Sequence, residues 1–179
     1  MRIIAGSRRG ATIFAPKGRA TRPTSDRVRE NVFNIVAPWV EGAHVLDLYA
    51  GSGAMGLEAL SRGAAAVVLV EAQPDAVRAI ERNLDKLRLT GAAVVRLDAT
   101  TALTHETAAR RKYDLVLVDP PYAMTDYAAL ARYLPHVLAD DGLLVFETAA
   151  RTEPALPGLV VRTSRRYGST RVTVFEHAP

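Results

Sequence analysis

Residues Asp119–Tyr122, with the sequence DPPY, carry the most specific chemical signal in this chain of 179 residues. The two prolines fix the backbone and remove two N–H donors, which leaves carbonyl groups and one carboxylate beside an aromatic ring. An exocyclic amino group on a planar base needs such partners, because its lone pair is delocalised into the ring. The Asp119 carboxylate and the Pro120 carbonyl can accept its two N–H hydrogens and align the lone pair for in-line attack on a methyl group. We therefore predict an acceptor site at Asp119, Pro120, Pro121 and Tyr122, in which Tyr122 stacks on the base and no metal takes part.

A glycine-rich loop, Asp47–Gly56, is the second chemical feature of the sequence. Gly51, Gly53 and Gly56 fit the pattern G-x-G-x-x-G, in which glycines let the backbone approach a nucleotide closely. Two cofactor classes share this pattern. A dinucleotide would place its pyrophosphate at the following helix N-terminus. S-adenosylmethionine has no phosphate and presents an amino acid end, a sulfonium, a ribose and an adenine. A tight turn that binds no ligand is the third interpretation.

Three acidic residues favour one of these cofactors. Asp47 precedes the glycines, Glu71 lies twenty residues after Gly51, and Asp98 follows the next expected strand. Carboxylates are tolerable near a sulfonium and an ammonium group, and Glu71 can accept hydrogen bonds from ribose hydroxyls. Asp98 can accept one from the adenine amino group. The series therefore suits S-adenosylmethionine better than NAD.

The elements that must position these residues alternate between strands and helices from residue 44 onward. Apolar runs predict strands, and apolar residues at helical spacing predict helices. Such a succession predicts a parallel sheet with helices on both faces, with ligands at its carboxyl edge. Two final strands without a helix between them predict an antiparallel hairpin. The expected strands are His44–Leu48, Ala66–Val70, Ala93–Leu97, Leu115–Val118, Leu143–Glu147, Leu159–Thr163 and Arg171–Glu176, and the expected helices are Ala54–Arg62, Pro74 to a stop at Gly91, Thr101–Arg110 and Thr125–Leu138.

The distribution of charge separates the first forty residues from the rest. The whole chain has a net charge of +4, yet residues 1–40 carry eight basic residues against Asp26 and Glu30. Residues 41–179 carry fifteen basic and seventeen acidic residues. A basic segment on a near-neutral body suggests an anionic partner such as a nucleic acid.

The N-terminal segment is expected to contain a hairpin and a helix. Two short β-capable runs, Arg2–Gly6 and Ala11–Ala15, flank a Gly-ended turn. After a Pro- and Arg-containing loop, Thr24 or Ser25 should cap a helix that Pro38 ends.

Composition excludes several classes of protein. The chain has no cysteine, which rules out disulfides, thiolate zinc sites, iron–sulfur clusters and a cysteine nucleophile. Its four histidines are far apart and show no metal-ligand spacing. The longest apolar run, Gly63–Val70, is too short for a membrane span, and the first residues lack a signal-peptide core. We therefore expect one domain in a cytoplasmic protein.

Three segments in order resemble the bacterial RsmD family over nearly the whole chain. They are RPTSDRVRENVFN at Arg22–Asn34, DLYAGSGAMGLEALSRGA from Asp47, and DPPY, with RYGST at Arg166–Thr170 in the C-terminal part. The resemblance implies an α/β class I methyltransferase fold, Rossmann-like, with a seven-stranded mostly parallel sheet and an antiparallel C-terminal hairpin. It also implies a small N-terminal β-hairpin extension at 1–20 that lies on rRNA, followed by the methyltransferase domain at 21–179.

The same resemblance implies a methyl transfer from S-adenosylmethionine to N2 of a guanine in 16S rRNA, position 966 in the usual rRNA numbering. The partner is then the 30S subunit or an assembly intermediate, and we expect a monomer. The implied cofactor residues are Asp47, Tyr49, Gly51, Ser52 and Gly53 for the methionine end, Glu71 and Gln73 for the ribose, Asp98 and Ala99 for the adenine, and Thr24, Ser25 and Arg27 above the cofactor. For the RNA we predict phosphate contacts by Arg2, Arg8, Arg9, Lys17 and Arg19.

Alternatives remain open. The same fold could methylate DNA adenine N6 or a protein glutamine, although glutamine enzymes usually carry Asn where this chain has Asp119, and 179 residues leave no room for a DNA-recognition domain. A nicotinamide oxidoreductase would need a hydride-transfer acid that the sequence does not offer. A non-catalytic RNA-binding module would bind neither cofactor. Arg165, Arg166 and Arg171 flank the C-terminal turn and fit phosphate contacts or solvated surface equally well.

Overall fold

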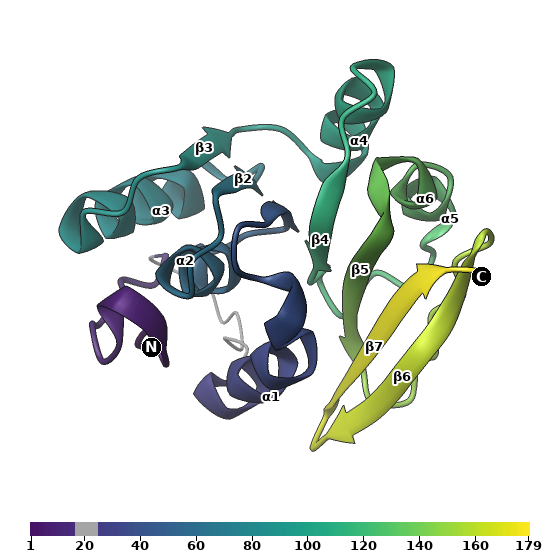
Figure 1. Cartoon of the computed structure of the whole chain (residues 1–179), viewed down its shortest axis with the longest axis horizontal. Helices are drawn as coiled ribbons and strands as arrows, with labels where there is room; N and C mark the ends of the chain where they lie inside the picture. Colours follow the sequence, from purple (N-terminus) through teal and green to yellow (C-terminus); the bar gives the residue numbers. More distant parts are fainter. Residues whose placement is uncertain (17–24) are drawn as a thin grey trace.

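A computed structural model describes residues 1–16 and 25–179 and shows one central sheet with helices on both faces (Figure 1). The strands of the described chain are β1 (His44–Leu48), β2 (Ala66–Val70), β3 (Ala92–Val95), β4 (Tyr113–Val118), β5 (Leu138–Ala149), β6 (Leu159–Tyr167) and β7 (Thr170–His177). The helices are α1 (Asp26–Val36), α2 (Ala54–Ser61), α3 (Pro74–Leu87), α4 (Ala99–Ala108), α5 (Ala128–Ala131) and α6 (Leu134–Val137), with the short 3-10 helices η1 (Gly6–Arg8) and η2 (Ala37–Trp39).

The strand order is β3-β2-β1-β4-β5-β7-β6. Strands β1 to β5 are parallel, and β7 is antiparallel to both of its neighbours, β5 and β6. The order reverses between β1 and β4, which is the place in an open α/β sheet where ligand crevices form. The predicted seven-stranded, mostly parallel sheet with an antiparallel C-terminal hairpin is confirmed.

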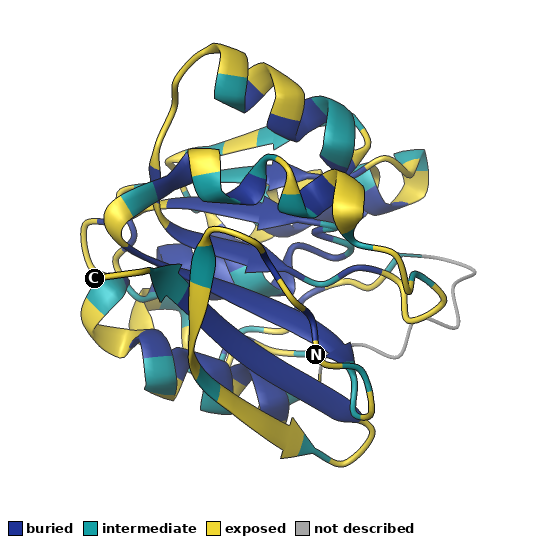
Figure 2. Cartoon of the chain, turned by 90° about the vertical axis from the view of Figure 1, so that its right-hand side faces the viewer, coloured by how far each residue is buried: buried dark blue, intermediate teal, exposed yellow. Residues whose placement is uncertain are grey.

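Two apolar layers hold the helices on the sheet. Alternate residues of each strand point to opposite faces, so Val45 of β1 packs with α1, α2 and α3, whereas Leu46 packs with α4, α5 and α6. Figure 2 shows the inner strands largely buried between these layers and the edge strand β6 largely exposed. Burial on both faces explains why β1 and β4 have nearly continuous apolar sequences rather than alternating ones.

Local chemistry fixes the ends of most elements. Helix α1 begins at Asp26 because the Oγ atom of Ser25 accepts the N–H of Val28 at 3.2 Å, as expected for Ser25 as a cap. Helix α3 begins at Pro74 as predicted. It ends at Leu87, earlier than the predicted stop at Gly91, because Arg88 already adopts a left-handed conformation with φ +50°.

Four elements in the C-terminal part differ from the prediction. The single helix expected over Thr125–Leu138 is two short helices, because Pro135 lacks the N–H that a continuous helix would need and instead occupies the start of α6. Strand β5 then begins at Leu138, earlier than expected, and β6 and β7 extend to a turn of only Gly168 and Ser169.

The N-terminal segment reverses direction without forming the predicted strands. A single antiparallel bridge joins Arg2 and Thr12, and η1 occupies the turn. The predicted antiparallel pairing is confirmed in part, since the Ile3 N–H donates to Ala11 O at 2.9 Å and the Ile13 N–H donates to Met1 O at 3.1 Å. The paired runs are shorter than predicted, and the buried side chains of Ile3 and Ile13 hold them against α2 and α3. Helices long and apolar enough for a bilayer do not occur in the described ranges 1–16 and 25–179.

Candidate active site at the carboxyl edge of the sheet

The predicted site residues follow the carboxyl ends of β1 to β4, which are neighbours in the sheet. Backbone bonds fix the loops at this edge: the Ala50 N–H donates to Val70 O at 3.0 Å, and the Asp119 N–H donates to Leu48 O at 3.4 Å. The structure therefore brings the glycine loop, Glu71 and the loop with the sequence DPPY to one edge.

Asp47 lies beneath the glycine loop and is only 2% exposed. Its Oδ2 accepts the backbone N–H of Gly56 at 2.8 Å. Burial raises the pKa of Asp47 to about 7, the bond from Gly56 opposes that rise, and the charges of Asp119 and Glu71 add to it. A Cβ atom at position 56 would lie 2.8 Å from the Leu69 side chain and 3.0 Å from the Asp47 carboxylate, so this close approach requires glycine.

The glycine-loop amides are used inside the protein. The Gly51 N–H donates to Oε2 of Glu71 at 2.9 Å, and the Gly53 N–H donates to Ala50 O at 2.7 Å. The Gly56 N–H is bonded to the buried carboxylate described above. Two of these three acceptors are carboxylates, so the loop is lined with negative charge instead of forming the cradle of free amides that a phosphate needs.

Tyr49 connects the glycine loop to the loop that carries DPPY, at Asp119–Met124, which we call the acceptor loop. Its φ of +61° is unusual for a side chain of this size, and its hydroxyl lies 3.8 Å from Sδ of Met124. Burial raises the pKa of the Tyr49 phenol, and the charge of Asp98 and the nearby Tyr127 raise it further. A strained backbone of this kind is common in ligand-binding loops.

Glu71 is almost completely buried and organises the region around the expected ribose. Its Oε1 accepts the backbone N–H of Gln73 at 2.8 Å, while its Oε2 accepts that of Gly51. A carboxylate has about four acceptor positions, so two remain for hydroxyl donors. The side chain of Gln73 is exposed at the start of α3 and makes no capping bond.

Asp98 caps helix α4. Its carboxylate accepts the N–H of Thr101 at 3.0 Å and the hydroxyl of Thr101 at 2.6 Å, and these bonds lower its pKa. Sequence reasoning placed Asp98 at a strand end but missed the cap, although an Asp three residues before a Thr at a helix start is a common signal. Asp98 remains exposed and Ala99 is buried as the first residue of α4.

The acceptor loop leaves β4 at Val118 and turns where the Met124 N–H donates to Pro121 O at 2.8 Å. Tyr122 is 39% exposed, and its hydroxyl lies 2.6 Å from Oγ1 of Thr170 and 3.3 Å from Oε1 of Glu147. Burial raises the pKa of the Tyr122 phenol, so the hydroxyl stays protonated and can donate to the carboxylate. The sequence analysis gave no role to Thr170, although it is the last residue of the segment RYGST, and it did not single out Glu147.

Comparisons with known proteins place the chain in a family. A family model described as "Conserved hypothetical protein 95" matches residues 1–176. The Bacillus subtilis protein named "Putative rRNA methyltransferase YlbH" is 38% identical over 183 residues, which cover 98% of each chain. The Escherichia coli "Ribosomal RNA small subunit methyltransferase D" is 38% identical over 153 residues, which cover 86% of this chain and 74% of the relative. The chain belongs to the RsmD family.

A solved structure supports the same assignment. The structure described as "Putative methyltransferase yhhF from Escherichia coli" is 34% identical and superposes with a TM-score of 0.87. The superposition covers 99% of this chain and 97% of that one. The strand order and the N-terminal segment are therefore features that this RsmD family member shares with a protein of the same size.

Asn83 is a buried residue that the sequence analysis of this RsmD family member overlooked. It lies on α3, and its amide nitrogen donates to the carbonyls of Ser52 and Phe14, each at 3.0 Å. Its Oδ1 accepts the Phe14 N–H at 2.7 Å. The signal was available, since Asn83 stands between Ile80 and Leu87 on the apolar side of the helix. The Ser52 hydroxyl itself lies 3.8 Å from Sδ of Met1 and so faces the N-terminal segment.

The predicted RNA contacts of the N-terminal segment occupy different environments. Arg2 and Arg9 are exposed, with Nε of Arg2 3.7 Å from the Asp26 carboxylate. The Arg8 guanidinium instead donates to the carbonyls of Leu87 and Arg88, where it caps the end of α3. Arg8 therefore has a structural role beside the predicted one. Ser25 and Arg27 are exposed at the start of α1, and Thr24, Lys17 and Arg19 lie outside the described residues.

A buried ion network fixes the N-terminal segment. Glu58 of α2 has no exposed surface, and its carboxylate accepts the N–H groups of Ile4 at 2.8 Å and Ala5 at 3.0 Å. It also pairs with Arg62 at 2.7 Å and with the fully buried Arg29 at 3.6 Å. One of the eight basic residues counted as an N-terminal cationic surface is thus inside the protein.

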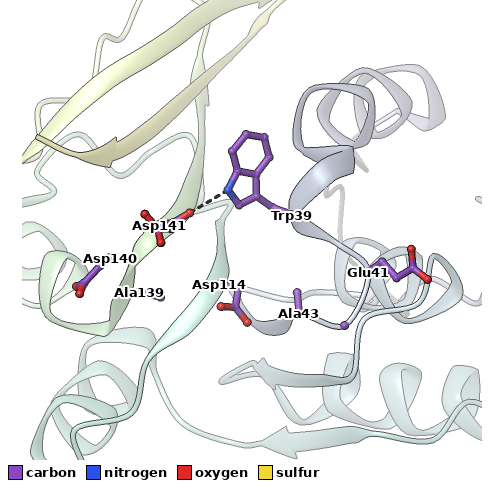
Figure 3. Close-up of a pocket in the computed structure, with 8 residues that line it drawn as sticks. Trp39, Glu41, Ala43, Asp114, Ala139, Asp140 and Asp141 are labelled. Atoms are coloured by element: carbon purple, nitrogen blue, oxygen red, sulfur yellow. Dashed lines mark hydrogen bonds between the residues drawn. The ribbon is translucent and has the colours of Figure 1, made fainter. Parts of the chain in front are cut away.

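An open hollow of about 440 Å³ lies at the opposite, amino-terminal edge of the sheet. Its lining includes Trp39, Asp114 and Asp141, and the Trp39 indole N–H donates to Asp141 O at 2.9 Å (Figure 3). The Asp114 carboxylate is bonded to the His44 amide, so it serves the start of β1. Within residues 1–16 and 25–179 no group of His, Asp or Glu side chains is arranged to hold a metal ion.

Proposed function

We propose that this protein transfers a methyl group from S-adenosylmethionine to N2 of a guanine in 16S rRNA of the small ribosomal subunit. The target is guanine 966 in the usual rRNA numbering, the substrate is the 30S subunit or an assembly intermediate, and the active form is a monomer. The acceptor loop carries the proposal: Asp119 follows β4 directly, its amide is bonded to Leu48 at the end of β1, and the ring of Tyr122 is partly exposed. The names of the relatives support rRNA as the acceptor.

The glycine loop fits S-adenosylmethionine and disfavours NAD. A pyrophosphate would meet the carboxylates of Asp47 and Glu71, and it would find the amides of Gly51 and Gly56 already bonded to them. A cationic ligand is attracted by the same groups. When bound, S-adenosylmethionine supplies a methyl group made electrophilic by the sulfonium.

The remaining cofactor contacts follow from the acceptors at the strand ends. Glu71 keeps lone pairs for the two ribose hydroxyls, and Asp98 remains exposed to accept from the adenine amino group. Asp47, beneath the loop, balances the positive methionine end by its charge. Tyr49, Ser52, Gly53, Gln73 and Ala99, together with Ser25 and Arg27, complete the proposed cofactor site.

The acceptor loop activates the amino group by hydrogen bonding and alignment. The Asp119 carboxylate and the Pro120 carbonyl accept the two N–H hydrogens of N2, which localises its lone pair. The lone pair forms the N–C bond as the C–S bond breaks, and the electron pair of that bond stays on sulfur. N2 then releases its surplus proton to the Asp119 carboxylate or to water. Tyr122 stacks on the base after it leaves its helix or loop.

The decisive experiment offers the protein several acceptors side by side. Unmethylated 30S subunits, naked 16S rRNA, duplex DNA and total cell protein are incubated with labelled S-adenosylmethionine, and the modified nucleotide is mapped. We expect label at N2 of one guanine in 30S subunits. Label on adenine, on glutamine or on another guanine contradicts the proposed acceptor, and binding of NAD but not of S-adenosylmethionine contradicts the proposed cofactor.

A further inference from the structure

We propose that the end of the β6–β7 hairpin is a second rRNA-contacting surface, in which the guanidinium groups of Arg151, Arg165 and Arg166 bind phosphates next to the target nucleotide. We call these three residues the hairpin arginines. The inference rests on the proposed function, because it assumes that the acceptor beside Tyr122 is a nucleotide of an RNA chain.

The hairpin end lies beside the acceptor loop. The first residue of β7, Thr170, is bonded to the Tyr122 hydroxyl at 2.6 Å, and Ser169 in the turn accepts the N–H of Ala150 at 2.8 Å. Arg151 is therefore adjacent to the turn, since it follows Ala150 directly. Figure 1 shows this turn at the same end of the sheet as the carboxyl ends of β4 and β5. A chain that places a base on Tyr122 must pass close to the hairpin.

The region is strongly basic and its charge is only partly neutralised. Residues 150–175 contain five arginines, and their only acidic residue is Glu153. Arg162 and Arg171 form ion pairs, with Glu176 at 2.6 Å and with Glu153 at 3.0 Å. The other three are the hairpin arginines, which are exposed and form no ion pair with any residue of the described chain. Their charge is thus free to attract a polyanion.

One pair in the hairpin is unfavourable without an anion. Arg166 stands directly opposite Arg171 in the β6–β7 register, and like charges in that position destabilise a sheet. The Arg171 side chain is nearly buried and held by Ser164 and Glu153, so it cannot move away. Glu153 offsets part of this repulsion from the side of Arg171, and a phosphate beside Arg166 would offset the rest.

The register places the positive charges on both faces of the edge strand. Val172 of β7 is paired with Arg165 of β6 on one side and with Glu147 of β5 on the other, so the three side chains lie on the same face of the sheet. This is the face on which Glu147 accepts the Tyr122 hydroxyl. Arg166, the next residue, lies on the other face. Because β6 is the last strand of the sheet, an RNA backbone that crosses this edge meets a guanidinium group on each side.

The hairpin and the N-terminal segment lie on opposite sides of the acceptor loop. The N-terminal segment packs on α2 and α3, beside β2 and β3, whereas β6 is at the far edge of the sheet (Figure 1). Arg9 follows the η1 turn, which is bonded to the last residues of α2 and α3 and therefore lies at the amino-terminal edge of the sheet. The exposed Arg2 and the hairpin arginines can then hold the RNA on both sides of the nucleotide. This arrangement favours an extended polyanion over a small anion.

The test compares two double variants that remove the same charge. R165Q/R166Q changes the hairpin, and R78Q/R110Q removes two exposed arginines on α3 and after α4. Binding to 30S subunits is measured between 50 and 200 mM salt, together with KM for the subunit, kcat, and the dissociation constant for S-adenosylmethionine. R165K/R166K keeps the charge, and R151Q tests the third arginine alone.

We expect R165Q/R166Q to reduce by about two units the slope of log affinity against log salt concentration. The ratio of its dissociation constant to that of the unmodified protein should then fall about tenfold between the lowest and the highest salt concentration. KM for the subunit should rise, while cofactor affinity and the salt slopes of R78Q/R110Q and R165K/R166K stay those of the unmodified protein. R151Q should reduce the slope by about one unit. An R165Q/R166Q slope equal to that of R78Q/R110Q overturns the inference. If the unmodified protein methylates no rRNA, the proposed function fails instead.

Discussion

The hydroxyl of Tyr122 lies 2.6 Å from Oγ1 of Thr170, the first residue of β7. Because β7 runs antiparallel to β5, its first residue stands at the carboxyl edge, opposite Ala149. Thr170 is buried, whereas Tyr122 is 39% exposed. The bond therefore anchors the hydroxyl end of the side chain and leaves part of the ring to contact a base.

Replacing Thr170 by Val removes this anchor while keeping the shape of the side chain. Loss of one neutral hydrogen bond is worth about 1 kcal/mol, so we expect kcat to fall roughly fivefold. The Thr170→Ser variant keeps the hydroxyl and should keep the rate, and cofactor affinity should not change in either. Steady-state methylation of 30S subunits measures the rate of each variant. A loss in the Ser variant with none in the Val variant would show that Thr170 acts through packing alone.

Replacing Asp119 by Ala should abolish methyl transfer and leave cofactor binding nearly intact. The carboxylate is proposed to accept from the reacting amino group, and removal of such a partner typically costs about a hundredfold or more in kcat. Calorimetric titration with S-adenosylmethionine should give a dissociation constant close to that of the unmodified protein. The control is Asp126→Ala, whose carboxylate is exposed and accepts only the Ala128 N–H among the described residues. Full activity of the Asp119 variant contradicts the assignment of the acceptor site.

Ionisation of Asp47 should make the folded protein less stable as the pH rises. The unfolded chain ionises this group near its ordinary pKa of 3.8, whereas burial raises the folded-state pKa to about 7. Between these values the folded state binds more protons, so the stabilising effect is complete below pH 4 and is lost as the pH rises through about 7. Relative to Asp47→Asn, the unmodified protein should lose about 3 kcal/mol between pH 5 and pH 8. Urea unfolding measures this difference, and a difference independent of pH would contradict the raised pKa.

Replacing Glu58 by Gln should destabilise the protein and release the N-terminal segment. The substitution leaves the buried Arg29 with Asp26, at 3.0 Å, as its one remaining carboxylate partner among the described residues, and we expect a cost of about 1–3 kcal/mol. Hydrogen exchange at the amides of Ile4 and Ala5, which donate to Glu58, should accelerate more than exchange in the central strands. Glu81→Gln on the exposed face of α3 is the control. Unchanged exchange at these two amides would show that the ion network does not hold the segment.

Residues at the sheet edge were predictable because their position follows from where each apolar run ends. The bounds of β1 and β2 agree residue by residue with the prediction, and Asp47 and Glu71 then fall at neighbouring strand ends. The Asp–Pro–Pro backbone also needs no tertiary information, since proline restricts it locally. The apolar runs do not predict which lone pairs of a carboxylate already accept backbone N–H groups, as two of those on Glu71 do.

Contacts between distant segments escaped prediction for a different reason. Arg29 and Glu58 are charged residues in helices, and charged residues in helices are usually exposed, so nothing in either sequence neighbourhood indicates that they pair inside the protein. The pairing of Tyr122 with Thr170 depends on the antiparallel register of β5 and β7. The predicted hairpin at Arg2–Ala15 forms only one bridge, and the packing of its apolar residues against α2 and α3 is information that local propensity does not contain.

The side chain of Asn83 has a practical consequence for the dissection of RNA binding. It connects the backbone of Phe14 to the backbone of Ser52, while Glu58 holds Ile4 and Ala5. Residues 1–16 thus complete the hydrogen bonding of the helices that support the glycine loop. A protein that lacks residues 1–16 would expose the unpaired side-chain amide of Asn83 and the charge of Glu58. We therefore expect its glycine loop to become less ordered. Replacing a single exposed residue such as Arg9 by a neutral one removes one positive charge and leaves these hydrogen bonds intact.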